Sequence, residues 1–384
     1  MKFTGTIHSK QPTIATSIFA TMSALANEHQ ALNLSQGFPD FDISEEMISR
    51  VHHYMKQGFN QYAPMPGVPS LRKAISKVAS QLHGISYDPE TEITVTAGAT
   101  QAIFTAIAAF IRDDDEAIIF EPAYDTYAPA VKVNGGRVKY AHLQMPDYTI
   151  NWEQTARLVS SHTRMIIINT PHNPTGAVFS AEDMEQLSRL TQNTDILVLS
   201  DEVYEHLIFD GFQHESACRY PHLAQRSLVI GSFGKTFHAT GWKTGYVMAP
   251  ENLTKEFRKM HQWVLFAANT PIQMALADML ADEKNYTSLA DFYQQKRDLF
   301  LDLIAGSRFK VVPSHGTYFQ CLDYSAISDA SEMDFATTLV KQHKIASIPI
   351  SRFYHDGKDD KILRFCFAKK EETLRKAGEI LCKI

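Results

Sequence analysis

Short apolar runs rich in β-branched residues recur through the middle of the chain, separated by longer stretches with helical spacing. Some runs, such as Ile166-Ile167-Ile168, are continuously apolar, which is typical of strands buried on both faces. The pattern therefore predicts an α/β fold with a mostly parallel sheet sandwiched by helices. The predicted strands are Ile93–Thr96, Ala117–Phe120, Met165–Asn169, Ile196–Ser200, Leu228–Gly231 and Gly245–Met248, and the predicted helices are Thr100–Ile111, Ala181–Gln192 and one starting near Asn252.

The pattern of apolar and charged residues changes beyond about Asn285, where it predicts a long charged helix at Leu289–Leu303. Two strand-like runs follow it, at Thr317–Leu322 and Ile362–Phe367. Because 384 residues exceed the roughly 250–300 that one core supports, we expect two domains that share a cleft. The expected limits are residues 43–284 for a large domain and 285–384 for a smaller α+β domain. Residues 1–42 are expected to pack with the small domain.

Composition narrows the possible partners. Hydrophobic residues make up 44% of the chain, charged residues 21%, and the net charge is -6, so nothing in the charge favours nucleic acid. No run of ~18 apolar residues predicts a membrane span, and Met1–Pro12 does not have the pattern of a signal peptide. The four cysteines lie far apart without a CxxC pair, so we expect no metal site. We expect a cytoplasmic protein that acts on a small molecule.

Lys235 stands in the segment Ser232-Phe233-Gly234-Lys235-Thr236, directly after an apolar run. A phosphate-binding P-loop also ends in Gly-Lys-Thr, but it requires a glycine five residues before its second glycine, and position 229 is valine. The alternative is a lysine nucleophile at the end of a strand, with Ser232 able to bind a phosphate oxygen. The sequence is also compatible at this point with Lys235 being a solvated surface lysine.

Three further segments follow predicted strands, where ligands of open α/β sheets bind. Asp201 and Tyr204 follow one strand, and a carboxylate there could face the pyridine nitrogen of a cofactor or cap the next turn. Asn173 lies in the Asn169–Gly176 loop, whose two prolines and glycine predict an irregular rigid backbone. The small residues of Thr96–Gln101 join a strand to a helix, which is a suitable anion site.

These segments occur in the order and spacing of the fold type I, class I aminotransferases, which depend on pyridoxal 5′-phosphate (PLP), and the whole chain resembles that family. Within it, the chain looks most similar to the group of bacterial methionine aminotransferases and the related glutamine and kynurenine aminotransferases. The matching segments are Asn33–Phe41, Asn60–Pro64, Asn169–Gly176, Asp201–Tyr204, Ser232–Thr236 and Arg364–Phe367.

The resemblance implies a role for each residue of a cofactor site. Lys235 would carry PLP as a Schiff base, and Asp201 would pair with its pyridine nitrogen. Many family members have arginine where this chain has a lysine in the phosphate site, and lysine lacks the bidentate geometry. The remaining implied contacts are Tyr204 and Asn173 to the ring oxygen, Tyr124 to the ring face, and Ala99, Thr100, Ser232 and Lys243 to the phosphate, with Tyr62 reaching in from the partner subunit of a homodimer.

The resemblance also implies a substrate site in which Arg364 binds the α-carboxylate, and a planar guanidinium suits a carboxylate on chemical grounds too. A buried structural arginine is the alternative. Gly37 and Asn173 would also bind this carboxylate. Phe19, Phe38 and the segment Trp263–Phe266 are similar to residues that line the pocket for the substrate side chain in the relatives. The implied reaction is a ping-pong transfer of the amino group of methionine to a 2-oxo acid, with aromatic amino acids, glutamine and kynurenine as neighbouring donors.

Two other functions are compatible with the same motifs. A PLP-dependent cysteine-conjugate β-lyase would use the same residues, because the carbanion at Cα can expel a leaving group from Cβ. A ligand-sensing module without turnover is the second alternative, and the filling of every expected catalytic position weighs against it.

Overall fold

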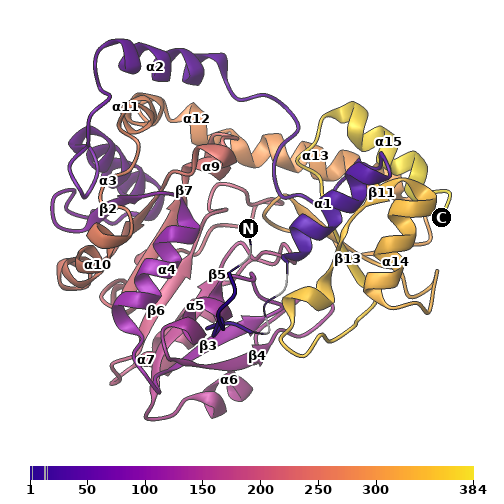
Figure 1. The fold of residues 1–384 in the computed structure, drawn as a ribbon, viewed down its shortest axis with the longest axis horizontal. Helices are drawn as coiled ribbons and strands as arrows, with labels where there is room; N and C mark the ends of the chain where they lie inside the picture. The colour runs from indigo at the N-terminus through magenta and orange to yellow at the C-terminus, as the bar shows by residue number, and fades with distance from the viewer. Residues whose placement is uncertain (2, 13, 15) are drawn as a thin grey trace.

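The computed structural model describes residues 1, 3–12, 14 and 16–384. Figure 1 shows a larger part with its sheet on the left and a smaller part in orange and yellow on the right. The long helix α13 (Leu289–Ile304) runs between the two parts, and the indigo helix α1 (Ile18–Glu28) lies among the elements of the smaller part. The residue limits of the three expected domains stay a prediction.

The central sheet of the larger part has seven strands in the order β2-β8-β7-β6-β5-β3-β4. The five strands from β7 to β4 run parallel, whereas β8 is antiparallel to both of its neighbours. The mostly parallel sheet is thereby confirmed. The strands are β2 (Ile93–Thr96), β3 (Glu116–Glu121), β4 (Arg137–His142), β5 (Thr163–Asn169), β6 (Leu197–Asp201), β7 (Ser227–Ser232) and β8 (Gly245–Met248).

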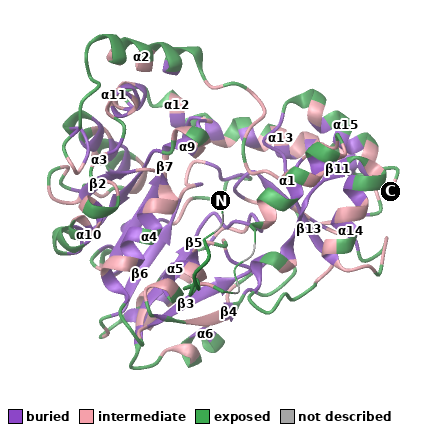
Figure 2. Cartoon of the chain, in the orientation of Figure 1, coloured by how far each residue is buried: buried purple, intermediate pink, exposed green. Residues whose placement is uncertain are grey.

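Alternate residues of the sheet's inner strands belong to two different hydrophobic cores. Ile166 and Ile168 of β5 pack in one core, while Ile167 packs in the other. The sheet is therefore buried on both faces, as the purple strands between the helices of Figure 2 show. The helices of this part are α2 (Glu45–Lys56), α3 (Pro69–His83), α4 (Ala99–Phe110), α5 (Tyr127–Val133), α6 (Trp152–Leu158), α7 (Ala181–Thr191), α8 (Pro221–Ala224), α9 (Phe233–Thr236), α10 (Glu251–Val264), α11 (Thr270–Met279) and α12 (Lys284–Thr287).

The smaller part is built on a four-stranded antiparallel sheet in the order β12-β13-β10-β9. Its elements besides α13 are β9 (Lys310–Val311), β10 (Phe319–Asp323), α14 (Glu332–Thr338), β11 (Ile345–Ala346), β12 (Ile348–Pro349), β13 (Ile362–Cys366) and α15 (Glu371–Leu381). The N-terminal β1 (Leu32–Asn33) pairs in parallel with β11, so this stretch of the N-terminal segment packs on the smaller part. Strand β10 begins at Phe319 because Thr317, at a φ of 65°, interrupts the extended backbone.

Two negative findings concern the described residues only. Within them, no helix has both the length and the apolar character that crossing a membrane requires. The same residues contain no group of three or more histidine, cysteine, aspartate and glutamate side chains arranged to hold a metal ion.

Candidate active site

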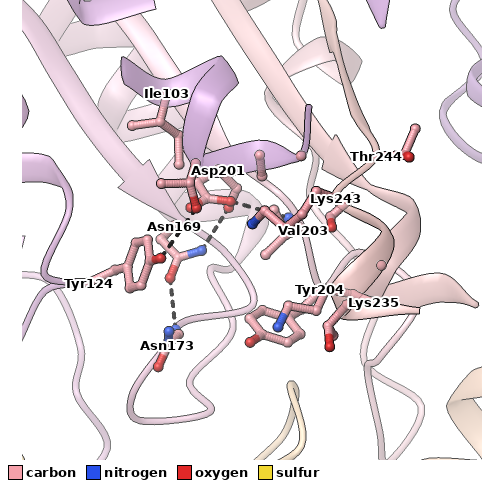
Figure 3. A pocket seen from close by; sticks show the side chains of 16 residues that line it. Ile103, Tyr124, Asn169, Asn173, Asp201, Val203, Tyr204, Lys235, Lys243 and Thr244 are labelled. Atoms are coloured by element: carbon pink, nitrogen blue, oxygen red, sulfur yellow. Dashed lines mark hydrogen bonds between the residues drawn. The ribbon is translucent and has the colours of Figure 1, made fainter. Parts of the chain in front are cut away.

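A cavity of about 150 Å³ lies at the carboxyl ends of strands β5, β6 and β7 and at the start of helix α4 (Figure 3). This is the edge of the sheet where ligands of open α/β folds bind. The structure brings together there every expected cofactor residue of the chain except Tyr62: Ala99, Thr100, Tyr124, Asn173, Asp201, Tyr204, Ser232, Lys235 and Lys243.

Lys235 lies in α9, the short helix that follows β7 directly, and its side chain lines the cavity. Burial lowers the pKa of Lys235 to about 8, and the cations Arg364 and Lys243 act in the same direction. Its Nζ is 5.4 Å from the centroid of the Tyr204 ring. Figure 3 shows the two side chains next to each other. Among the described residues, Lys235 forms no ion pair with a carboxylate. The amine is therefore available as a nucleophile and base near neutral pH.

Asp201 ends strand β6 and is 3% exposed. Burial raises the pKa of its carboxyl to about 6, although the hydroxyl of Tyr127 donates a hydrogen bond to it at 2.5 Å. Asn169 fixes the neighbouring backbone, because its Nδ2 donates to the Asp201 carbonyl at 2.8 Å and its Oδ1 accepts from the N–H of Asn173 at 2.8 Å. A buried carboxylate without a protein cation in contact is suited to receive a positively charged group of a ligand.

Tyr204 follows Asp201 by one turn and is 2% exposed. Burial raises the pKa of its phenol, so the hydroxyl remains protonated over the physiological range and can donate a hydrogen bond. Tyr124, at the opposite side of the cavity, has its hydroxyl 3.4 Å from Oγ1 of Thr100. The two tyrosines and Asn173 thus provide polar groups around the space in front of Lys235.

The start of helix α4 forms one end of the cavity. Gly98 precedes the helix with a φ of 80°, and no side chain in the described part of the chain caps the first N–H groups. The φ of 80° favours glycine at this position, and a Cβ built on Gly98 would lie 3.4 Å from Nζ of Lys243, so that ammonium lies close to the helix end. Ser232 lines the same region. The free N–H groups, the helix dipole and the ammonium together favour a phosphate group.

Arg364 lies on β13 of the smaller part and is 1% exposed. Nη1 donates to Oδ1 of Asn173 at 2.7 Å, Nη2 donates to the carbonyl of Ser35 at 3.2 Å, and Nε has no partner among the described residues. The guanidinium packs 3.8 Å from the centroid of the Phe319 ring and 5.3 Å from that of Phe19. Since no described carboxylate pairs with this buried cation, a substrate carboxylate is the natural counter-ion.

Several residues that the resemblance connects to the site lie elsewhere in this chain. Tyr62 is 83% exposed, with its ring centroid 5.2 Å from that of Phe266, and Trp263 is 82% exposed. Phe38 is 44% exposed and lies under the ammonium of Lys369 at 5.0 Å. These side chains are outside the cavity of their own chain, so the roles expected for them require a second subunit or stay untested.

The structure adds two tyrosines to the site that sequence reasoning missed. Tyr127 binds Asp201, and the hydroxyl of Tyr318 accepts a hydrogen bond from Nζ of Lys235 at 2.7 Å. The sequence offered one indication that Tyr127 belongs to the site, because this residue begins the helix that follows the segment containing Tyr124. For Tyr318 it offered none, because the approach of this residue to Lys235 depends on how the smaller part packs on the larger one.

Comparisons with known proteins place the chain in a family. The profile of Aminotransferase class I and II matches residues 29–381, and the chain belongs to this family. It is 48% identical to the methionine aminotransferase of Escherichia coli K12, over 97% of either chain. It is 34% identical to human kynurenine–oxoglutarate transaminase 1, over 94% of this chain and 93% of the relative.

Solved structures agree with this assignment. The structure of YbdL from Escherichia coli, described as having a methionine aminotransferase function, superposes with a TM-score of 0.97 at 47% identity and covers 99% of this chain and 100% of that one. Thermus thermophilus aspartate aminotransferase superposes with a TM-score of 0.90 at 28% identity and 99% coverage of both chains. The class I aminotransferase fold and the enzyme class expected from the sequence are confirmed.

Proposed function

We propose that this aminotransferase uses pyridoxal 5′-phosphate to transfer the amino group of methionine to a 2-oxo acid. One observation carries the proposal: a single cavity joins the amine of Lys235 to the buried carboxylate of Asp201, and the unpaired guanidinium of Arg364 adjoins it through Asn173. Methionine as the donor is supported by the similarity to the methionine aminotransferase of Escherichia coli. Kynurenine, glutamine and aromatic amino acids remain neighbouring donors to be tested.

The residues of the cavity fit the proposed cofactor. The helix end at Gly98 and the ammonium of Lys243 suit its phosphate, and the buried carboxylate of Asp201 suits a protonated ring nitrogen. Tyr204 and Asn173 would hold the ring oxygen, while the other proposed contacts are Ala99, Thr100 and Ser232 to the phosphate and Tyr124 to the ring face. When bound, this cofactor supplies an electron sink that stabilises negative charge at the substrate Cα.

The reaction steps assigned to the chain follow from its own groups. Arg364 would bind the substrate carboxylate with two parallel hydrogen bonds, one of them from the Nε that has no partner among the described residues, and thereby fix the orientation of Cα. Gly37, Phe38 and Phe19 would contribute to the substrate site. Lys235 then takes the Cα proton on Nζ, which its lowered pKa of about 8 makes possible near neutral pH. Tyr204 keeps its proton and orients the ring oxygen.

A homodimer is part of the proposal. Tyr62 and Phe266 form an exposed aromatic pair, and Trp263 nearby in sequence is also exposed. Tyr62 would reach the active site of the partner subunit, with a twofold axis generating two equivalent sites. The domain limits 1–42, 43–284 and 285–384, and the cytoplasmic location, are carried as predictions with this proposal.

The half-reaction with methionine tests the proposal directly. The visible spectrum of the protein reconstituted with PLP is recorded before and after L-methionine is added without any 2-oxo acid, in the wild type and in Lys235→Ala. We expect the cofactor band to be lost and the methionine 2-oxo acid to form stoichiometrically in the wild type only. A wild-type protein that takes up no PLP contradicts the cofactor, whereas a band that ignores methionine contradicts only the donor.

Product analysis in the same experiment separates the rival reaction. A 2-oxo acid that retains the methionine side chain indicates transamination. With a cysteine conjugate as the substrate, pyruvate and a free thiol would indicate a β-lyase.

A further inference from the structure

Tyr318 is a fully buried tyrosine of the smaller part that reaches across to the lysine of the larger part. It directly precedes strand β10 and is 0% exposed. Its ring centroid lies 5.1 Å from that of Tyr204 in a T-shaped arrangement, and its hydroxyl contacts both Nζ of Lys235 and the carbonyl oxygen of Gly37. The side chains of Tyr204, Lys235 and Tyr318 and the Gly37 carbonyl thus lie close together between the two parts of the molecule.

The direction of each hydrogen bond at this point follows from the available protons. A carbonyl oxygen only accepts, so the contact between Tyr318 and Gly37 must use the single hydroxyl proton of Tyr318. The contact of 2.7 Å between Tyr318 and Lys235 must then be donated by Nζ. The contact of 3.3 Å between Nζ and the Gly37 carbonyl is donated by Nζ as well. Burial raises the pKa of Tyr318, so its hydroxyl stays protonated and this direction is maintained.

A neutral lysine amine has two N–H bonds, one bond to Cε and one lone pair. In this arrangement the two N–H groups donate hydrogen bonds to the Tyr318 hydroxyl and the Gly37 carbonyl, so the lone pair is confined to the fourth tetrahedral position. Without these acceptors the amine would rotate freely about the bond between Cε and Nζ, and the lone pair would have no fixed direction. An oriented base lowers the entropic part of a proton-transfer barrier.

We propose that Tyr318, together with the Gly37 carbonyl, is a positioning residue that directs the lone pair of Lys235 toward the substrate Cα. This inference rests on the proposed function. In the step concerned, a bond forms between Nζ and hydrogen while the bond between Cα and hydrogen breaks, and the electron pair of the broken bond stays on the substrate. Tyr318 itself neither gains nor loses a proton.

The local backbone is built to allow this contact. A Cβ built on Gly37 would lie 2.7 Å from the Phe319 ring, which is too close, and 3.6 Å from the Tyr318 ring, so the packing of Phe319 favours glycine at this position. Thr317 adopts the left-handed region with a φ of 65° directly before Tyr318 and is fully buried. This conformation is unfavourable for a β-branched residue, and here it sets the direction in which the Tyr318 side chain leaves the backbone.

Tyr318→Phe tests the proposal because it removes only the hydroxyl and keeps the ring packing. Tyr293→Phe is the matched control, since Tyr293 is also fully buried and its ring centroid lies 5.8 Å from that of Tyr318, but its hydroxyl binds His238 instead of Lys235. We expect Tyr318→Phe to slow the methionine half-reaction about 10–100-fold with little change in methionine affinity. The primary isotope effect with α-deuterated methionine should increase, because proton transfer becomes the slow step. Tyr293→Phe should change neither quantity.

A second readout uses protein from which PLP has been removed. The extent of Lys235 acetylation by a limiting dose of acetic anhydride, measured by mass spectrometry across a pH series, gives the pKa of its amine. We expect a lower pKa in Tyr318→Phe than in the wild type, because the phenol oxygen accepts a hydrogen bond from the charged amine. Unchanged pKa and isotope effect, or equal losses in both variants, would overturn the proposal. Since labelling needs neither PLP nor methionine, it can succeed even where the proposed function fails.

Discussion

The acidic side chains of the segment from Asp201 to Glu205 lie in two buried environments that shift their pKa values in opposite directions. Asp201 lies on the cavity side, and burial raises its pKa to about 6. Glu202 and Glu205 lie in a histidine-rich cluster outside the cavity lining, and the nearby histidines keep their pKa values low despite burial. Among the residues that the structure describes, no cation contacts the carboxylate of Asp201, whereas histidines of the cluster contact Glu202 and Glu205. The first side is therefore prepared for a ligand, whereas the carboxylates of the second side already have partners within the protein.

The histidine cluster consists of short contacts between side chains that are at most 9% exposed. Nε2 of His214 lies 2.7 Å from Glu202, and Nε2 of His83 lies 3.1 Å from Glu205. Glu205 also accepts a hydrogen bond of 2.7 Å from Tyr246. Removing one partner of such a buried pair leaves an uncompensated charge. Substitutions in the cluster should therefore lower the free energy of unfolding, and substitutions on the cavity side should lower the catalytic rate.

Asp201→Asn should produce the largest functional effect. The amide cannot stabilise a protonated ring nitrogen, and we expect kcat/KM with methionine to fall by about 10³-fold. Stability without cofactor should be unchanged or higher, since the amide avoids burying a charge and can still accept from Tyr127. Steady-state kinetics and urea unfolding of the same preparations measure both. Activity within tenfold of the wild type would remove the distinction between the two sides.

Glu205→Gln should show the reverse pattern. We expect a loss of about 3–5 kcal/mol in unfolding free energy, because His83 loses its buried anion. At neutral pH, kcat of the folded enzyme should stay within about threefold of the wild type, since Glu205 does not line the cavity. Glu46→Gln is the control, because that carboxylate is 57% exposed and its ion pair with Arg50 should contribute about 0–1 kcal/mol.

The two sides should also give opposite slopes of stability against pH. Burial raises the pKa of Asp201 from its ordinary 3.8 to about 6, so the folded state binds the proton more tightly and stability falls as pH rises across that window. Glu205, whose pKa lies below its ordinary 4.5, adds stability that is present above 4.5 and is lost as pH falls through its folded pKa.

His83 extends this prediction to higher pH. Burial would lower its pKa, but the bond to Glu205 raises it above 6.5, so its contribution is complete below 6.5 and is lost as pH rises through the folded pKa. We expect the unfolding free energy of the wild type to decrease there and that of His83→Gln to decrease less. Parallel curves for both proteins, measured without cofactor, would show that His83 does not titrate with folding.

The ends of the strands were the predictable part of this site. Strand β5 was recognised because its residues are continuously apolar, and Asn173, Asp201 and Lys235 were placed together because the carboxyl ends of parallel strands share one edge. Strand β4 was missed, since it lies at the edge of the sheet and is mostly half-exposed, with charged residues along it.

The partners that cross between distant segments were not predictable. His83 ends α3 and Tyr246 belongs to β8, yet both contact Glu205. Tyr318 meets Lys235 only because the two parts of the molecule pack together. No periodicity or spacing in the chain encodes these approaches, because each depends on the packing of elements that are far apart in sequence.

Tyr127→Phe should have the smallest effect and the most diagnostic one. The Tyr127 hydroxyl donates to Asp201 at 2.5 Å and lowers the pKa that burial raises. Without it the carboxyl should ionise at higher pH, so kcat/KM should fall about tenfold near pH 6 and much less near pH 8. Tyr148→Phe is the control, since that buried hydroxyl has no partner among the described residues. Because phenylalanine keeps the ring contact with Tyr124, whose centroid is 5.6 Å away, a loss of equal size at every pH would contradict the assignment of the Tyr127 hydroxyl to the ionisation of Asp201.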